Sequence, residues 1–221
     1  ITKRFPGVVA LDHINFDVKP GEVHVLLGEN GCGKTTLLRL ISRLEKPTRG
    51  VILQNIDDKF GQKSKQSKKW YKKVGVVYQN PDYQLFMQTV EKEIKFGAKS
   101  DEYADEIAEK FGIKHLYARH PQSLSEGQKR RVSIAAVVAT DPEVLILDEP
   151  TVGQDYKGLC EMVEVLNKLH EEAHNTMITV THDKRCAAAL CDKSVWIKNG
   201  KTYKTGGKEL VDEFFIQIGV N

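Results

Sequence analysis

The segment GENGCGKTT, residues 28–36, has the residue types and spacing of a phosphate-binding loop. It fits the pattern G-x-x-x-x-G-K-[ST], directly after an apolar run and before a helical pattern. Glycines let successive backbone N–H groups turn inward on an anion, and the helix N-terminus adds partial positive charge. We therefore predict a nucleoside triphosphate site in which Lys34 contacts the β- and γ-phosphates. The predicted binding residues of this loop are Asn30, Gly31, Cys32, Gly33, Lys34, Thr35 and Thr36.

A pair of carboxylates supplies the second half of a hydrolytic site. Asp148 and Glu149 follow the apolar run 144–147, which reads as a buried strand. That strand delivers both acids to the same sheet edge as the phosphate loop, so Asp148 and Thr35 are predicted to hold Mg²⁺, Asp148 through water. Glu149 is predicted to be the base that activates the attacking water. Adjacent acids after a strand are as often a turn or helix cap, but the phosphate loop in the same chain favours catalysis.

A second anion-binding pattern lies far downstream, in HPQSLSEGQKRR at residues 120–131. Ser125 and Gly127 stand where a helix begins, with a hydroxyl and backbone N–H groups free for an anion. The intervening helical region is expected to project away from the phosphate loop. We therefore predict that this second grip closes over the nucleotide of another copy.

Strands and helices alternate at both ends of the chain, with a mainly helical stretch between them. This order predicts an α/β fold with a mainly parallel sheet and an inserted helical lobe. Strands are predicted at 13–18, 22–27, 51–53, 74–78, 144–148, 176–181 and 193–197, and helices at 37–44, 89–96, 102–111, 125–139, 156–172, 184–190 and 208–218.

Composition narrows the class of protein. With 221 residues, 40% of them hydrophobic, the chain can bury a sizeable core. A net charge of +3 does not indicate a nucleic-acid surface, and the lysine-rich stretch 59–73 reads as a solvated loop with a short helix. No apolar run approaches the roughly 20 residues that cross a bilayer. The four cysteines lack metal-site spacing and are predicted to be free thiols, and Trp70 and Trp196 to be packing residues.

The order of five motifs resembles the ATP-binding cassette (ABC) ATPase family over nearly the whole chain. They are GENGCGKTT, YQNPDYQLF, LSEGQKRRVSIA, VLILDEPTVGQD and VTHD. The resemblance implies a P-loop NTPase core at about 1–78 and 141–206, with a small antiparallel β region. It also implies a helical lobe at about 79–140 and a short C-terminal helix at about 207–221. The family's usual first strand would precede Ile1, so we expect a piece of a longer or tandem protein.

In that family two cassettes pair head to tail, and each ATP lies between the phosphate loop of one subunit and the signature stretch of the other. When the family's signature residues are carried over to this sequence, the contact with the other subunit's nucleotide falls to Ser125, Gly127 and Gln128. Asp155 matches the aspartate that communicates between the two sites. The implied cofactors are ATP and Mg²⁺.

Three further residues match family positions within the nucleotide site. Gln79 matches the glutamine that senses Mg²⁺ and the attacking water while linking to the membrane partner. His182 matches the switch histidine at the γ-phosphate. Phe5 stands where the family usually places an aromatic residue that stacks on adenine.

Three positions depart from the family pattern. Glu126 stands where glycine is common in the signature stretch, and we expect its carboxylate to point outward, where it favours the helix dipole. Gln154 stands where leucine is frequent in the loop that signals between the two sites of the family. Cys32 occupies a variable position of the phosphate loop, where we expect it to be a small filler.

The resemblance implies an ATP-hydrolysing subunit of an importer, held at the cytoplasmic face of the membrane by integral membrane partners, with no nucleic-acid partner. Residues 78–90 resemble ATPases of energy-coupling-factor and cobalt or nickel importers, which favours a metal ion or vitamin as solute. Residues 1–30 instead resemble monosaccharide-importer ATPases, often tandem cassettes. A soluble cassette acting on DNA or ribosomes is the alternative from another class, although the lobe has no room for a long coiled-coil insertion.

Overall fold

The computed structural model describes residues 1–54, 58–60, 70 and 72–219. Its centre is a six-stranded sheet in the order β10-β9-β3-β8-β7-β6. All neighbours in it are parallel except β10 and β9. Its strands are β3 (Val23–Leu27), β6 (Val74–Val77), β7 (Val144–Asp148), β8 (Thr176–Val180), β9 (Lys193–Lys198) and β10 (Lys201–Gly206). The predicted α/β class with a mainly parallel sheet is confirmed.

Two small antiparallel pairs lie beside the main sheet. Strands β1 (Lys3–Phe5) and β2 (Val8–Leu11) form one, and β4 (Ile52–Gln54) and β5 (Asp58–Phe60) form the other. The strand predicted at 13–18 is wrong. Among the described residues this segment joins no sheet: only Ile14 exchanges backbone hydrogen bonds with another segment, at Ile1. His13 has a φ of 56°, which interrupts a strand.

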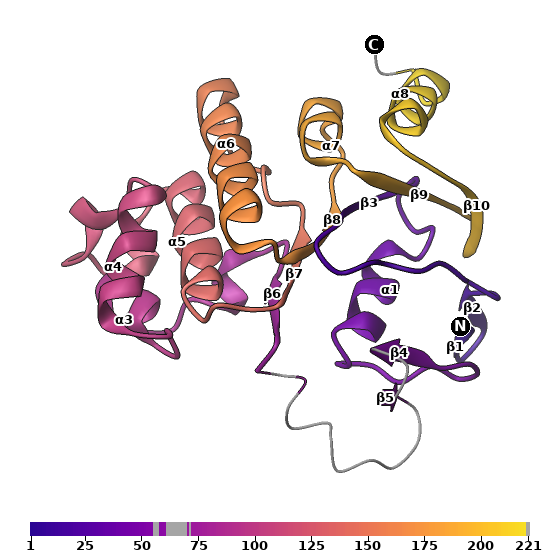
Figure 1. Cartoon of the computed structure of the whole chain (residues 1–221), viewed down its shortest axis with the longest axis horizontal. Coiled ribbons are helices and arrows are strands. Elements are labelled where there is room, and N and C mark those ends of the chain that lie inside the picture. The colour runs from indigo at the N-terminus through magenta and orange to yellow at the C-terminus, as the bar shows by residue number, and fades with distance from the viewer. Residues whose placement is uncertain (55–57, 61–69, 71, 220–221) are drawn as a thin grey trace.

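Helices cover both faces of the sheet (Figure 1). Leu145 and Leu147 point to the side of α5 and α6, while Ile146 points to the side of α1, as the alternation of a strand requires. These helices are α1 (Lys34–Ile41), α5 (Glu126–Val138), α6 (Tyr156–Ala173), α7 (Lys184–Leu190) and α8 (Lys208–Gln217). The C-terminal helix predicted at 208–218 is α8, whose Phe214 ring packs edge-on against Trp196. Both Trp70 and Trp196 are buried, which confirms them as packing residues.

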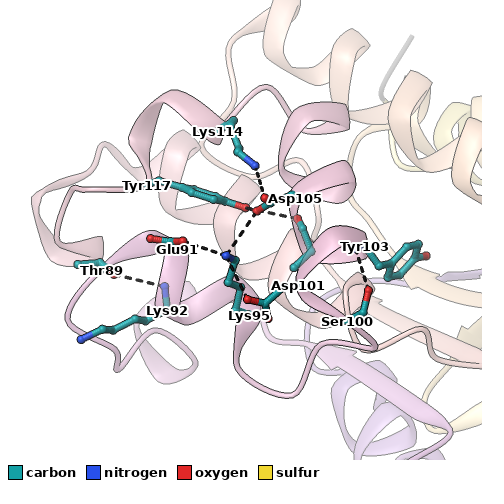
Figure 2. A network of polar contacts seen from close by, with 11 residues as sticks. Thr89, Glu91, Lys92, Lys95, Ser100, Asp101, Tyr103, Asp105, Lys114 and Tyr117 are labelled. Carbon is teal, nitrogen blue, oxygen red and sulfur yellow. Dashed lines mark hydrogen bonds and ion pairs between the residues drawn. The ribbon is translucent and has the colours of Figure 1, made fainter.

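The helices of residues 81–138 lie together at one end of the sheet (Figure 1). Beside α5 they comprise α3 (Val90–Lys95), α4 (Asp101–Lys110) and the short turns η1 (Pro81–Tyr83), η2 (Lys114–Leu116) and η3 (Pro121–Ser123). A network of ion pairs joins them (Figure 2): Lys95 bridges Glu91 and Asp101, and Asp105 contacts Lys114 and the Tyr117 hydroxyl, both at 2.7 Å. These contacts join α3 to α4 and α4 to η2. A helix as short as α3 is marginal by itself, so it depends on such contacts with its neighbours.

The predicted free thiols are confirmed, since all four cysteines are unpaired. In the described part of the chain, no helix is both long and apolar enough to cross a bilayer. The lysine-rich stretch 59–73 lies mostly outside the described residues.

Candidate active site

The phosphate loop joins the carboxyl end of β3 to the first turn of α1. Gly33 precedes α1 with a φ of 109°, a conformation that only glycine adopts readily. A Cβ there would lie 2.6 Å from Leu11 Cδ2 and 2.7 Å from the Ala10 carbonyl oxygen. Gly28 is equally confined, because a Cβ would lie 2.5 Å from the Ile197 carbonyl oxygen. The loop is therefore packed against β2 and β9, and no larger residue fits at either glycine.

Lys34 is held inside this loop. Its side chain is buried, and Nζ donates hydrogen bonds to the carbonyl oxygens of Gly28 at 2.6 Å and Glu29 at 2.9 Å. The ammonium group thus sits at the centre of the curved backbone, where an anion would meet it together with the N–H groups of the first turn of α1.

The acidic pair ends β7 beside β8. Both side chains are buried, and burial raises the pKa of the Asp148 carboxyl. Burial also raises the pKa of Glu149 to about 7. The Glu149 backbone has a φ of 54°, and its N–H donates to the Val180 carbonyl oxygen at 2.9 Å. This conformation turns the Glu149 side chain toward the residues that follow β8.

His182 contacts Glu149 directly. The His182 backbone N–H donates to Glu149 Oε2 at 3.1 Å, and its ring Nε2 lies 3.4 Å from Oε1. Burial lowers the pKa of the His182 imidazole, and the positive charge of Lys34 lowers it further. Both shifts favour the uncharged forms, the neutral imidazole of His182 and the protonated carboxyl of Glu149. A buried carboxyl group with a raised pKa beside an imidazole is suited to acid–base chemistry.

A cavity of about 660 Å³ brings the predicted hydrolytic residues together. Its lining comes from the phosphate loop, from β2 and from the carboxyl ends of β6, β7, β8 and β9. The predicted residues among them are Asn30, Gly31, Cys32, Gly33, Lys34, Thr35, Thr36, Gln79, Asp148, Glu149 and His182. The cavity is therefore the candidate nucleotide site. A second hollow, of about 810 Å³, lies elsewhere along α1 and contains none of the predicted site residues.

Several residues that line this cavity are absent from the sequence prediction. Val8 and Val9 come from β2, and Lys198, Asn199 and Gly200 from the turn between β9 and β10. The Gly200 N–H donates to the Cys32 carbonyl oxygen at 3.2 Å, so this turn supports the phosphate loop. The Asn-Gly pair is a recognisable turn signal. Its place beside the phosphate loop follows from the pairing of β9 with β3, which sequence pattern alone does not give.

Gln79 follows β6 and is exposed at the cavity wall. Its carbonyl oxygen accepts a hydrogen bond from the buried Arg130 of α5, which also donates to the Tyr78 carbonyl oxygen at 2.8 Å. Arg130 thus connects residues 78–79 to α5, the helix that begins with the signature residues. Sequence reasoning missed this arginine, since nothing in its spacing separates it from Lys129 and Arg131.

The signature residues stand apart from the cavity. Ser125 caps α5 in a reciprocal pair with Gln128: the Ser125 Oγ accepts from the Gln128 N–H at 3.4 Å, and the Gln128 Oε1 accepts from the Ser125 N–H at 3.1 Å. Glu126 is 67% exposed at its side chain and lies 3.4 Å from Lys129 Nζ. Its carboxylate points outward, as predicted. Ser125, Gly127 and Gln128 are not among the described residues that line the cavity.

Asp155 and Phe5 also lie outside the described cavity wall. Asp155 caps α6, with Oδ1 accepting from the Gly158 N–H at 2.7 Å. Phe5, on β1, is 40% exposed, with Lys3 Nζ 4.9 Å from its ring centroid. A role for either in nucleotide binding therefore remains a prediction.

The fold and cavity together define a P-loop nucleotide hydrolase of the cassette type: a glycine loop, a buried acidic pair and a histidine converge, and a capped helix stands apart. The ABC transporter family model matches residues 11–152, so the chain belongs to the ABC transporter family. Its members of this type bind and hydrolyse ATP, and the predicted ATPase activity and ATP cofactor are confirmed at this level.

Relatives and solved structures agree. The chain is 41% identical to the energy-coupling factor transporter ATP-binding protein EcfA2 of Bacillus subtilis (strain 168), over 90% of this chain and 75% of the relative. The chain is 40% identical to EcfA2 of Enterococcus faecalis (strain ATCC 700802 / V583), over 91% of this chain and 73% of the relative. The structure of cbiO1 from Clostridium perfringens, part of the ABC transporter complex cbiONQ, superposes with a TM-score of 0.83 at 35% identity, over 96% and 88%. The structure of MJ0796, a dimeric bacterial ABC transporter cassette, superposes with a TM-score of 0.81 at 28% identity, over 94% of this chain and 96% of that chain.

Proposed function

We propose that this chain is the ATP-hydrolysing subunit of an energy-coupling-factor importer, works as a head-to-tail pair of cassettes and docks on integral membrane proteins at the cytoplasmic face. The observation that carries the proposal is the meeting of Lys34, Glu149 and His182 in one cavity, with the capped start of α5 outside it. The EcfA2 and cbiO1 relatives, both from transporters, support the importer type and a small solute of the metal-ion or vitamin class.

The residues present fit Mg²⁺ as well as ATP. Thr35, Gln79 and Asp148 line the same cavity and offer oxygen ligands, the type that Mg²⁺ binds. Within the described residues, no group of three or more His, Cys, Asp and Glu side chains could hold a metal. A cation held by one carboxylate, a hydroxyl and the phosphates suits this composition. When bound, it would neutralise charge on the β- and γ-phosphates.

The proposed dimer assigns the remaining residues. Ser125, Gly127 and Gln128 would contact the nucleotide of the other subunit, and Asp155 would lie where the two subunits meet. Phe5 would stack on adenine at the open side of the cavity beside β2. The start of α5 supports this assignment, because Ser125 is exposed and is not among the described residues that line the chain's own cavity.

Ser125→Arg tests the pairing. A long cation at the tip of α5 would block the approach of the other subunit's nucleotide, so steady-state ATP hydrolysis is expected to fall at least about tenfold. ATP binding to the isolated subunit, measured by calorimetry, is expected to stay unchanged. Ser100→Arg is the matched control, because Ser100 caps α4 in the same manner and its loss costs about 1 kcal/mol of stability as well. Undiminished turnover by Ser125→Arg would contradict the pairing.

The surface proposed to meet the membrane partner follows Gln79. Phe86 is 66% exposed and packs edge-on against the exposed Phe96, with ring centroids 5.3 Å apart, and Tyr83 is exposed beside them in sequence. Exposed aromatic groups of this kind mark protein interfaces. Glu93 holds their loop, since its buried carboxylate accepts hydrogen bonds from the N–H groups of Phe86 and Met87.

Phe86→Asp tests the membrane partner. The charge would disrupt an apolar interface, so recovery of the chain with membranes, and solute uptake in cells, are expected to fall at least about tenfold, while ATP binding stays unchanged. Ile216→Asp on α8 is the control, because Ile216 is equally exposed but far along the chain from Gln79. Equal membrane recovery of wild type and Phe86→Asp would contradict this surface. Recovery of the wild type with ribosomes or DNA instead of membranes would favour the soluble alternative.

A further inference from the structure

Gln154, one of the three departures from the family pattern, contacts α5, the helix that begins with the signature residues, in its own subunit. Its side-chain Nε2 donates a hydrogen bond to the Gly127 carbonyl oxygen at 2.9 Å. Gln154 lies in the loop between β7 and α6, and Gly127 in the first turn of α5. A leucine at position 154 has no donor and could not make this bond.

The Gln154 amide is wedged between the first turns of two helices. A Cβ added to Gly127 would lie 3.3 Å from both amide atoms of Gln154, and one added to Gly158 would lie 2.5 Å from its Oε1. A side chain at either position would therefore displace the Gln154 amide from its present place. The two glycines let the amide lie flat between the helix backbones, which restricts its rotamer and favours the hydrogen bond.

The two ends of this contact belong to different nucleotide sites of the proposed dimer. On one side, the loop that carries Gln154 begins at Glu149, and turn hydrogen bonds connect them, from Val152 N–H to Glu149 at 3.4 Å and from Gln154 N–H to Thr151 at 3.2 Å. On the other side, Gly127 lies two residues after Ser125. A short chain of bonded groups thus joins the base proposed for the subunit's own site to the grip proposed for the other site.

We infer that Gln154 is a positioning residue that couples the two ATP sites, by holding the start of the signature helix to the loop that follows Glu149. This inference rests on the proposed cassette dimer. A displacement of the loop in one site moves the Ser125 end of α5 in the other, because the amide is bonded to one and confined by both helices. Coupling of this kind requires a structural element whose conformation is shifted by the state of either site.

The test compares Gln154→Leu, which removes the donor, with Gln154→Glu, which places a carboxylate oxygen opposite the Gly127 carbonyl. Steady-state ATP hydrolysis is measured over a range of ATP concentrations on the full chain. Wild type is expected to show a Hill coefficient between 1 and 2. Both variants are expected to bring it toward 1 and to lower kcat about three- to tenfold, with Glu the more severe, as the loss of one hydrogen bond predicts. ATP affinity of the isolated subunit is expected to stay unchanged.

Asn167→Leu is the matched control. Asn167 also lies on the α6 side of the fold, and its amide donates to the Ala189 carbonyl oxygen at 3.4 Å, away from both sites. If all three variants lower thermal stability alike and leave the Hill coefficient alone, the contact is merely structural and the inference is overturned. It is also overturned if wild type itself shows a Hill coefficient of 1. Failure of the dimer would show differently, as full turnover by Ser125→Arg.

Discussion

Glu149→Gln is expected to lower steady-state ATP hydrolysis at least about 100-fold, because the amide cannot take a proton from water and general base catalysis contributes roughly that factor or more. ATP binding is expected to persist, since Lys34 and the loop backbone are untouched. The ATP-bound pair of subunits should therefore accumulate. Turnover is measured by phosphate release, and pairing by size-exclusion chromatography with ATP.

The same variant has an expected effect on stability that depends on pH. Burial raises the pKa of Glu149 to about 7 in the folded chain, above the 4.5 of a free glutamate. Between these values the folded state binds more protons than the unfolded state, so the free energy of unfolding falls as pH rises. Glu149→Gln removes this loss. At pH 8 the nucleotide-free variant is expected to be more stable than wild type, by on the order of 3 kcal/mol, and the difference should vanish near pH 4.5.

Glu143→Gln is the control for both effects, because Glu143 lies exposed at the opposite end of the same strand. It should change neither turnover nor the pH dependence of chemical denaturation. Near-normal hydrolysis by Glu149→Gln would remove the base assignment. A stability difference independent of pH would show that the carboxyl titrates at its ordinary pKa.

Lys34→Ala is expected to weaken ATP binding at least about 100-fold. Hydrogen bonds from a charged donor contribute roughly 1.5–3 kcal/mol each, and Lys34 is predicted to contact two phosphates. Affinity is measured by calorimetry with Mg²⁺ and ATP. Hydrolysis should fall with it, because an occupied site is a condition for turnover.

A stability measurement and a control variant separate this effect from damage to the loop. Lys34 also donates to the Gly28 and Glu29 carbonyl oxygens, so its loss removes contacts that hold the loop closed. Thermal denaturation reports that loss without nucleotide. Lys201→Ala removes an exposed lysine paired with Asp12 and should leave affinity unchanged. If Lys34→Ala folds normally and binds ATP as wild type does, the phosphate cradle is placed wrongly.

The phosphate loop could be predicted from nine residues because its chemistry is local. A strand, two confined glycines and a helix start follow one another in sequence, and their order alone brings the N–H groups and Lys34 to one point. The capped start of α5 is local for the same reason, since Ser125 and Gln128 bond across a single turn. Asp148 and Glu149 needed one more rule, that parallel strands end at a shared edge.

The strand predicted at 13–18 shows where local pattern fails. Ile14, Phe16 and Val18 alternate as in a strand, and Ile14 is buried. In the described part of the chain, however, only Ile14 of these three exchanges backbone hydrogen bonds with another segment, at Ile1, and no ladder follows. The hairpin forms upstream instead, from β1 and β2, whose Val8 and Val9 reach the cavity. Alternation reports which side chains are buried, whereas a strand also requires a partner that only the folded chain supplies.

Residue identity and spacing were therefore enough to predict the phosphate loop and the acidic pair Asp148 and Glu149, because each of these depends on neighbours within one or two elements. The tertiary structure alone decided the pKa of Glu149, its contact with His182 and the bond between Gln154 and Gly127. Each of these depends on segments about 25 or more residues apart that meet only when the sheet is assembled. Burial and distance between such segments are properties of packing, and no local pattern contains them.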